Sequence, residues 1–431
     1  MLQRRKQMWE SSIELLSIKH QINFNTESNK TMHFLILGDL FSGLKPWLLD
    51  SQEPVGMPAV YNFYKYLGIS DEHKFKAYII TKTQDKVVFF PNGSQIFLRK
   101  LPINNHIVFR LASYFFMLYL AIKEAKQRKY NVVYGMANYS LCASFVGWLY
   151  NLPVVNRVFG TLATGHLQSG QMVKVYARHL LEFITAKFSR GILISTNDGT
   201  QYDEFVKFSK RKNPFFHLYN GIDNQFKASL LKIENALEFF PKNEVKIYSI
   251  GRLTNWKRHD QAIDVVFKLR QKSQIDYKLT ILGDGPDLQS LQKKIDSLNL
   301  NDSIKIIKSV PQKQYIELLK SADVCLFCYD HSNLGNALWE SALAGRLIAA
   351  KNTGDTGKVL RDNVNSIVVA DDEYFSDVMA SRILKATSSK DDNMVSLVES
   401  SRKDISNLIP SWEVRIQNEI SIIENGARNI R

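Results

Sequence analysis

The sequence predicts an α/β protein made of two consecutive domains, each built on a parallel sheet. Strand-like runs alternate with helical patterns of ten or more residues, which is typical of βαβ units. The alternation occurs twice, and the turn signal Asn220-Gly221-Ile222-Asp223 separates the two series. A chain of 431 residues is also long enough for roughly two to three domains.

We expect an N-terminal extension over residues 1–30, with a short helix at 9–18, then domains over 31–220 and 221–409. In the first domain, strands are expected at 32–38, 76–81, 95–98, 131–134, 153–158 and 191–195, and helices begin near 58, 106, 140 and 170, after a long loop at 39–55. In the second, strands are expected at 245–250, 277–282, 304–307, 324–328, 347–350 and 367–369, with helices between them. A final amphipathic helix begins near Pro410.

The composition is that of a globular protein with an excess of positive charge. The net charge of +14 attracts nucleic acid, anionic lipid or phosphorylated substrates. Nucleic acid is the least favoured of these, because no C2H2, KH or RRM signature is present. Three cysteines do not make a disulfide framework, which fits a reducing cytoplasm.

Membrane insertion is not expected from the sequence. The longest apolar stretch, residues 107–122, is interrupted by Arg110 and is expected to be too short to span a membrane. The first residues lead into a polar segment rather than the apolar core of a signal peptide.

The segment Gly251-Arg252-Leu253-Thr254-Asn255-Trp256-Lys257 is the first candidate site. It follows a buried strand, where glycine allows a ligand to approach the backbone, and it precedes a helix. In open α/β sheets, ligands bind beyond the carboxyl ends of the strands. Two cations there suit a diphosphate, since Arg forms a two-pronged contact and Lys supplies a point charge. The alternative is a pair of solvated surface cations in an ordinary loop.

Three further loops are expected at the same edge of the second sheet. Gly283-Asp284-Gly285-Pro286 is, taken alone, a generic turn before a helix. Asn333-Leu334-Gly335-Asn336 would present free backbone N–H groups at a helix start, an arrangement that binds anions. Glu340 lies about one and a half turns further, where its carboxylate would accept hydrogen bonds from sugar hydroxyls or simply face solvent. Thr353-Gly354-Asp355-Thr356-Gly357 opens another helix. Together these loops predict a nucleoside diphosphate site without a Walker motif.

These motifs identify a resemblance. Residues 245–370 resemble the C-terminal half of the GT-B glycosyltransferases, specifically the retaining family 4 group. The motifs are Gly251-Arg252-Leu253 with Lys257, Gly283-Asp284-Gly285-Pro286, Ser321-Ala322-Asp323-Val324-Cys325-Leu326-Phe327, and Glu340 to Gly345. The likeness extends more weakly to Gly56-Met57-Pro58, Phe159-Gly160-Thr161, Asn220-Gly221-Ile222-Asp223 and Trp412-Glu413.

The resemblance implies two Rossmann-like domains facing each other across a cleft, with the last helix, 410–431, crossing back to the N-terminal domain. It also implies a nucleotide-sugar donor, UDP- or GDP-linked, held by the C-terminal domain. Arg252 and Lys257 would neutralise the diphosphate and Glu340 would bind the ribose. The remaining donor contacts would come from Gly251, Gly283, Val310, Ser332, Leu334, Gly335 and Asn336.

One departure from the family pattern concerns the donor sugar. The family has two glutamates eight positions apart, and the first of these positions is Ser332 here. Asp330 and His331 are near but out of register. A serine hydrogen-bonds a hydroxyl but supplies no charge, so this change affects which sugar is bound. We interpret it as a subfamily variation rather than a loss of activity.

The N-terminal domain offers fewer candidates. The resemblance places the acceptor there, and Gly56, Arg157, Thr161 and His166 are the candidates on the acceptor or phosphate side. His166 alternatively lies in a loop without a chemical role. No metal is expected: Cys325 and Cys328 fall on a buried strand without a second ligand pair, and the chain lacks an Asp-x-Asp motif. No cofactor is therefore required beyond the donor.

The basic excess has a local pattern in residues 106–130. Five cations, Arg110, Lys123, Lys126, Arg128 and Lys129, accompany the aromatic residues Phe109, Tyr114, Phe115, Phe116 and Tyr119. Such a helix either lies on an anionic membrane surface or is a core helix with a solvated basic end. The first alternative would suit a lipid-linked acceptor and a peripheral position on the inner face of the membrane.

The sequence is therefore interpreted as that of a cytoplasmic, retaining glycosyltransferase. It would move a hexose-type sugar from a nucleoside diphosphate to a glycan or lipid-linked acceptor, in cell-surface polysaccharide or lipopolysaccharide synthesis. Two alternatives stay open: an epimerase of nucleotide sugars with the same fold, and a catalytically degenerate binding protein.

Overall fold

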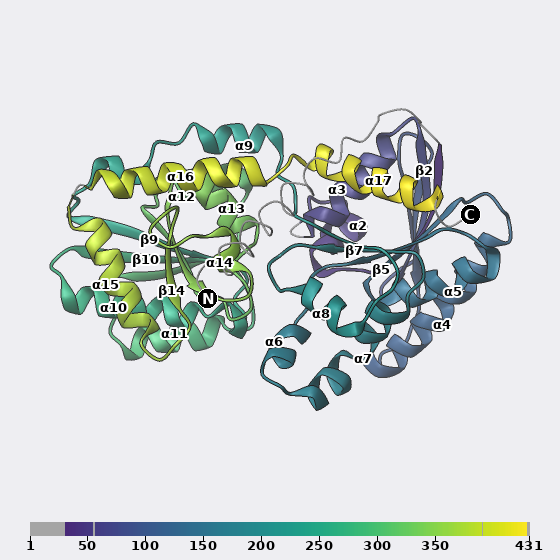
Figure 1. The fold of residues 1–431 in the computed structure, drawn as a ribbon, viewed down its shortest axis with the longest axis horizontal. Coiled ribbons are helices and arrows are strands. Elements are labelled where there is room, and N and C mark those ends of the chain that lie inside the picture. Colours follow the sequence, from purple (N-terminus) through teal and green to yellow (C-terminus); the bar gives the residue numbers. More distant parts are fainter. Residues whose placement is uncertain (1–30, 55–56, 390, 429–431) are drawn as a thin grey trace, which may run out of the picture.

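The computed structural model describes residues 31–54, 57–389 and 391–428 and contains two α/β domains (Figure 1). Each domain has its own sheet, of eight strands in the first and six in the second. The predicted fold class is thereby confirmed. The predicted N-terminal extension and its helix at 9–18 lie outside the described residues.

The N-terminal sheet has the order β3-β4-β2-β1-β5-β6-β7-β8. All neighbouring strands are parallel except β3 and β4. Helices cover both faces of such a sheet, so its central strands β1, β5, β6 and β7 are almost wholly buried. The strands are β1 (Met32–Gly38), β2 (His73–Thr81), β3 (Lys86–Phe89), β4 (Gln95–Lys100), β5 (Val132–Met136), β6 (Val154–Val158), β7 (Ile192–Thr196) and β8 (Phe215–Leu218).

The observed secondary structure of this domain differs from the prediction mainly in its short helices and strands. The loop expected at 39–55 contains α2, and β3, β8, α6 and α8 were not predicted. These elements have four to eight residues, too few for a hydrophobic period to be recognised. The helices are η1 (Ser42–Leu44), α2 (Lys45–Asp50), α3 (Pro58–Ile69), α4 (His106–Ala125), η2 (Ala137–Tyr139), α5 (Ser140–Tyr150), α6 (Ala163–Gln168), α7 (Met172–Phe188) and α8 (Tyr202–Ser209).

Helix α4 corrects one expectation. It has 20 residues, capped by the Asn105 side chain, which accepts hydrogen bonds from the Ile107 and Val108 N–H groups. By length and composition alone it is long and apolar enough to cross a membrane, so the prediction that this stretch is too short was wrong. Its inner face, however, packs into the N-terminal domain through Met117 and Ala121. The helix therefore belongs to the wall of an α/β domain.

The C-terminal sheet has the order β11-β10-β9-β12-β13-β14, and every strand is parallel to its neighbours. Its strands are β9 (Glu244–Ile250), β10 (Asp276–Leu282), β11 (Ile304–Ile307), β12 (Val324–Phe327), β13 (Leu347–Asn352) and β14 (Ile367–Ala370). Its helices are α9 (Asn224–Leu231), η3 (Ala236–Phe239), η4 (Asn255–Lys257), α10 (His259–Lys272), α11 (Leu288–Ser297), α12 (Gln312–Ser321), α13 (Asn336–Leu343), α14 (Thr356–Val359), α15 (Phe375–Thr387) and α16 (Asp392–Leu408).

The chain crosses back between the domains at its end. Helix α16 lies on the C-terminal domain, and the yellow α17 (Trp412–Arg428) lies on the N-terminal domain (Figure 1). At the crossing, Ile222 donates to the Pro410 carbonyl at 3.0 Å and accepts from the Trp412 N–H at 3.1 Å. The helix then packs against α3.

Candidate functional site

The C-terminal sheet has a switch point between β9 and β12. From β9 the strand order continues to β10 and β11 on one side and to β12, β13 and β14 on the other. The loops after β9 and β12 therefore leave the same edge in opposite directions. In open α/β sheets, ligands bind at this position. Both loops carry the residues that the sequence singles out.

The loop after β9 lies tightly against the loop after β10. A methyl group on Gly283 would lie 1.9 Å from the carbonyl oxygen of Gly251, and one on Gly285 would lie 2.3 Å from that of Leu253. The Leu253 N–H donates to the Asp284 carbonyl at 2.9 Å. Glycine is needed here because the two backbones touch. Both predicted motifs thus form one rigid base for the site.

Lys257 is held between aromatic rings at this edge. Its Nζ lies 3.4 Å from the ring centroid of Tyr329 and 4.1 Å from that of Trp256. Burial lowers the pKa of this ammonium to about 7; the Asp198 carboxylate opposes the shift and the Arg252 guanidinium adds to it. A bound diphosphate would supply the negative charge that keeps Lys257 protonated.

Arg252 is the exposed cation of the pair. Its side chain makes no hydrogen bond or ion pair with any residue in the described ranges. An unpartnered guanidinium beside a half-buried ammonium leaves two positive charges for an anion. The sequence prediction placed these two residues together, and the structure has them on one loop at the switch point.

The loop after β12 ends at the start of α13. Asn333 fixes the loop: its Oδ1 accepts from the Tyr329 N–H at 3.0 Å and its Nδ2 donates to the Lys351 carbonyl at 2.6 Å. The space around Gly335 is open, because a methyl group there would meet no atom within 4 Å. The first turn of α13 is thus presented toward a free volume, the arrangement that binds phosphate oxygens.

Ser332, Leu334 and Asn336 lie around this helix start. The Ser332 Oγ accepts from the Leu334 N–H at 3.1 Å, so the hydroxyl supports the loop. Leu334 is buried. Asn336 accepts at its Oδ1 from the Asn220 side chain at 3.1 Å, which ties the helix start to the interdomain segment.

Glu340 is half-buried and lies beside the hydroxyl of Tyr315 of α12. Burial raises the pKa of its carboxyl to about 7, and the neighbouring Tyr315 hydroxyl only partly offsets this. The described residues contain no cation within ion-pair distance of Glu340. Val310, which lies half-buried just before α12, borders the same side of the sheet.

The N-terminal domain contributes a loop after β7 that contacts the site. The Gly199 carbonyl accepts from the Asp355 N–H at 2.9 Å, and Gln201 donates to the Asp355 carboxylate at 2.9 Å. Asp198 lies beside them, where its Oδ1 accepts from the Thr200 hydroxyl at 2.6 Å. Burial raises the pKa of Asp198. This carboxylate therefore faces Lys257 from the opposite domain.

The other N-terminal candidates have structural surroundings. Arg157 is 2% exposed; it donates to Thr196 Oγ1 at 2.8 Å, and its Nε lies 3.7 Å from the Glu419 carboxylate of α17. Because the Arg157 guanidinium is buried and already bound by these groups, it is not available to a phosphate or an acceptor. The prediction that Arg157 contacts either of them is therefore corrected. Thr161 is also buried, and its Oγ1 accepts from the Ala163 N–H at the start of α6.

His166 lies on α6, with its ring 5.7 Å from that of His179. Burial and then the neighbouring His179 lower its pKa. The adjacent Gly165 faces the C-terminal domain, since a methyl group there would lie 3.7 Å from Nδ1 of His331. Gly56 lies outside the described residues.

Four residues around the site received no role from the sequence: Asp198 and Tyr329 were not singled out, and Trp256 and His331 were named only as neighbours of Lys257 and Ser332. Asp198 follows a predicted strand in an Asp-Gly turn, a signal that could have placed it at this sheet edge. Tyr329 and Trp256 carried no comparable signal, because aromatic residues beside strands are usually core. Their role follows from the ring contacts with Lys257.

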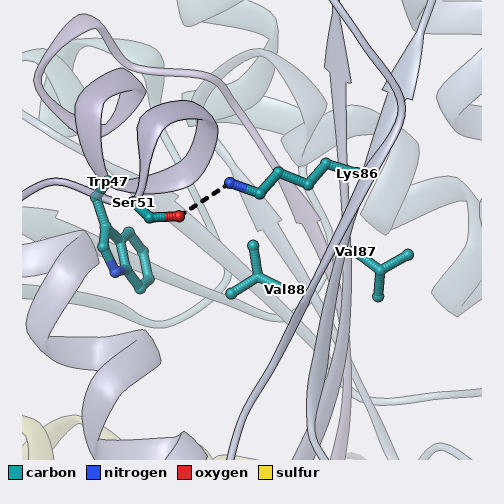
Figure 2. Close-up of a pocket in the computed structure, with 5 residues that line it drawn as sticks. All are labelled: Trp47, Ser51, Lys86, Val87 and Val88. Carbon is teal, nitrogen blue, oxygen red and sulfur yellow. Dashed lines mark hydrogen bonds between the residues drawn. The ribbon is translucent and has the colours of Figure 1, made fainter.

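No group of three or more metal-binding side chains occurs in residues 31–54, 57–389 and 391–428. Cys325 and Cys328 are buried and unpaired. A hollow of about 280 Å³ lies elsewhere, where α2 meets the edge strand β3 (Figure 2). There Lys86 donates to the Leu49 carbonyl at 2.8 Å and to the Ser51 hydroxyl at 3.3 Å. This hollow contains none of the site residues described above.

The C-terminal domain is similar to known proteins. Residues 233–404 match the family described as "Glycosyl transferases group 1". An uncharacterized glycosyltransferase of Methanocaldococcus jannaschii is 26% identical over 155 residues, 36% of this chain and 39% of that protein. An alpha-monoglucosyldiacylglycerol synthase of Streptococcus pneumoniae is 22% identical over 259 residues, 57% of each chain. The matches thus span about two fifths to three fifths of these relatives' lengths.

The fold of the whole chain is matched by solved structures. HepE of Anabaena in complex with UDP superimposes with a TM-score of 0.64 at 13% identity, covering 91% of this chain and 100% of that protein. At this identity the likeness concerns the fold alone. It extends over both domains, whereas the family match is confined to the second.

Proposed function

We propose that this chain is a retaining glycosyltransferase, because residues 233–404 match the group 1 glycosyltransferase family and both domains share the fold of a solved UDP-binding protein. It takes a hexose-type sugar from a UDP- or GDP-sugar and transfers it to a glycan or to a lipid-linked acceptor. The donor is bound by the C-terminal domain, and the acceptor approaches from the N-terminal domain.

One observation carries the proposal. Arg252 and Lys257 follow β9, and the open start of α13 follows β12, so both loops lie at the switch point of a parallel sheet, where ligands of such sheets bind. A diphosphate matches this combination of charge and hydrogen-bond donors. Glu340, about one and a half turns beyond Gly335 in α13, is the group proposed to accept hydrogen bonds from the ribose.

Catalysis would consist of positioning and electrostatic stabilisation. Departure of the nucleoside diphosphate concentrates negative charge on its phosphate oxygens, and Arg252 and Lys257 stabilise that charge as it develops. The anomeric carbon becomes oxocarbenium-like as its bond to the diphosphate oxygen breaks, and the acceptor hydroxyl attacks from the face that the diphosphate leaves. Its proton passes to an oxygen of the departing diphosphate. No metal ion is assigned to this step.

The acceptor and the location are the finer part of the proposal. A glycan or lipid-linked acceptor of cell-surface polysaccharide or lipopolysaccharide synthesis would place the enzyme in the cytoplasm, at the inner face of the membrane. The name of the pneumococcal relative refers to a glucosylated diacylglycerol, which supports a lipid-borne acceptor.

The test is thermal stabilisation by UDP, GDP and ADP, alone and as nucleotide sugars. A nucleotide at about 100 times its Kd adds about 2.7 kcal/mol of stability. We expect one base to stabilise the wild type and Lys293→Ala, an exposed control on α11, but not Arg252→Ala. A shift of equal size in Arg252→Ala would refute the donor site.

An epimerase is the second candidate, because His331 and His166 lie at the domain contact and Asp198 faces Lys257 there. Epimerisation needs such acid and base groups but no acceptor. Incubation with donor alone separates the two activities: an altered sugar still linked to the nucleotide would favour the epimerase.

A binding protein that has lost catalysis is tested at Ser332. If the serine abolishes transfer, Ser332→Glu should restore activity with a nucleotide sugar. If the wild type already transfers sugar, the degenerate alternative is excluded whatever the variant does.

A further inference from the structure

Helix α4 carries an apolar stripe on its exposed side. Ile107, Leu111, Phe115 and Tyr119 follow one another at intervals of four residues, and they are 71%, 61%, 69% and 58% exposed. Residues four apart lie on one face of a helix. The next position in the series is Lys123, so the stripe ends in a cation.

The stripe is not the side of the helix that builds the core. The opposite side buries Met117, Ala121 and Ala125 against β1, β2 and α5. From the sequence alone, this segment is either a helix that lies on a membrane surface or a core helix with a solvated basic end. The structure shows that α4 has an apolar face in the core and a second apolar face outside it.

Two other helices on the same side of the sheet also expose apolar side chains. Helices α4, α5 and α7 lie together on one side of the N-terminal sheet, and α4 packs against α5 (Figure 1). We call their outward side the apolar helical face. Besides the stripe it contains Val108, Phe145, Trp148, Leu149, Val173, Tyr176, Leu180, Leu181 and Phe188. Many exposed apolar side chains on one side of a domain mark an interaction site.

The charge around the apolar helical face has one sign. Residues 101–190 contain ten Lys and Arg but only two acidic residues, Glu124 and Glu182. Glu124 is buried and is bound by Lys76, Tyr78 and Tyr130. Glu182 contacts His179 at 3.2 Å, and burial raises its pKa to about 7. The described surface of these helices is therefore apolar and basic without a free carboxylate.

We propose that the apolar helical face docks the N-terminal domain onto an anionic lipid bilayer. Aromatic and aliphatic side chains flanked by Lys and Arg suit the boundary between headgroups and acyl chains. A second copy of this chain is a poorer occupant, because residues 31–220 carry 22 Lys and Arg against 11 Asp and Glu, and two such surfaces repel.

The docking orientation would serve the proposed function, on which this step of the inference rests. Helices α4 and α7 begin after the carboxyl ends of the parallel strands β4 and β6, the sheet edge that also carries Asp198. The exposed residues Ile107, Val108 and Val173 lie in the first turns of these helices. A bilayer in contact with them would hold a lipid-linked acceptor near the donor.

Vesicle co-sedimentation of the full chain tests the proposal. The probes are vesicles of phosphatidylcholine alone and vesicles of phosphatidylcholine mixed with phosphatidylglycerol. We expect binding to the anionic vesicles that weakens with salt, and at least a tenfold weaker partition for Leu111→Gln/Phe115→Gln. The matched control, Tyr374→Gln/Val378→Gln, changes two exposed apolar residues of the C-terminal domain and should bind like the wild type.

Three results would overturn the docking proposal: no binding of wild type to anionic vesicles, equal binding by the stripe variant, or a dimer in solution that buries the face and excludes vesicles. Thermal stabilisation of the same proteins by nucleotides distinguishes failure of the docking proposal from failure of the proposed function. Lost vesicle binding with retained nucleotide stabilisation refutes docking alone. Retained vesicle binding without nucleotide stabilisation refutes the donor site alone.

Discussion

The two domains share an architecture but differ in what they leave exposed. Residues 31–220 have a net charge of +11, whereas residues 221–409 carry 26 Lys and Arg against 25 Asp and Glu, a net charge of +1. Helices α4, α5 and α7 expose thirteen large apolar side chains. Among the described residues of 221–409, only four large apolar side chains are exposed: Leu231, Val364, Tyr374 and Val378.

The difference separates two kinds of binding surface. In the C-terminal domain the outward helix faces are polar, and the unusual groups are concentrated at one sheet edge: a lysine of lowered pKa, a carboxyl of raised pKa and an unpartnered arginine. In the N-terminal domain the unusual surface is the apolar helical face formed by α4, α5 and α7. A small polar ligand fits the first surface, and an extended apolar, anionic surface fits the second.

The largest expected effect is on the stability of the N-terminal domain, with donor binding by the C-terminal domain unchanged. Glu419→Gln removes the carboxylate that contacts buried Arg157 and Arg415. An uncompensated buried charge costs about 3–5 kcal/mol, measured by denaturant unfolding. The exposed Glu413→Gln is the matched control on the same helix and should be neutral. Unchanged stability with weakened donor binding would instead return Arg157 to the phosphate site.

The next effect concerns the sheet edge of the C-terminal domain. Arg252→Ala should cost roughly 1.5–3 kcal/mol of charged hydrogen bonding, which lowers kcat/KM about tenfold to over a hundredfold. Steady-state kinetics with the preferred donor measure it, and Lys293→Ala serves as control. Turnover within twofold of wild type would place the diphosphate elsewhere.

The lowered pKa of Lys257 predicts that the affinity for a nucleoside diphosphate depends on pH. Because burial lowers its pKa to about 7, the free protein loses this cation as pH rises above 7, and a diphosphate must restore the proton on binding. Affinity for the nucleoside diphosphate should therefore fall by up to about tenfold per pH unit above pH 7. Lys257→Arg should remove this decline, since arginine stays protonated. Calorimetry in buffers of different ionisation enthalpy would reveal the proton uptake, and its absence in wild type would contradict the assignment.

The smallest effect concerns Glu340 and sharpens the assignment of the ribose. Burial raises the pKa of its carboxyl to about 7, so the charged acceptor is lost as pH falls below 7. Glu340→Gln should weaken nucleotide binding by about 0.5–1.5 kcal/mol and flatten its acid limb. Pyrophosphate, which lacks ribose, should bind wild type and variant alike. A matching loss for pyrophosphate would place Glu340 among the phosphate contacts.

Sequence reasoning worked best where a strand is long, apolar and followed by a glycine. All six strands of the C-terminal domain were predicted within three residues at each end, and so were the loops carrying Arg252, Lys257 and Gly335. It worked less well in the N-terminal domain. The edge strand β3, with half-buried residues and an antiparallel partner, has no continuous apolar run to mark it.

The sequence by itself determined the two α/β domains, the cations at the second sheet edge and the aromatic, basic character of α4. Those features depend on local order and hydrophobic period, which are written in consecutive residues. Only the tertiary structure decided that Arg157 pairs with Glu419 and that the Asp198 carboxylate acts on Lys257. It also decided that the apolar stripe of α4 is exposed. Each of these depends on partners far away in the chain, and burial and charge pairing are set by those partners.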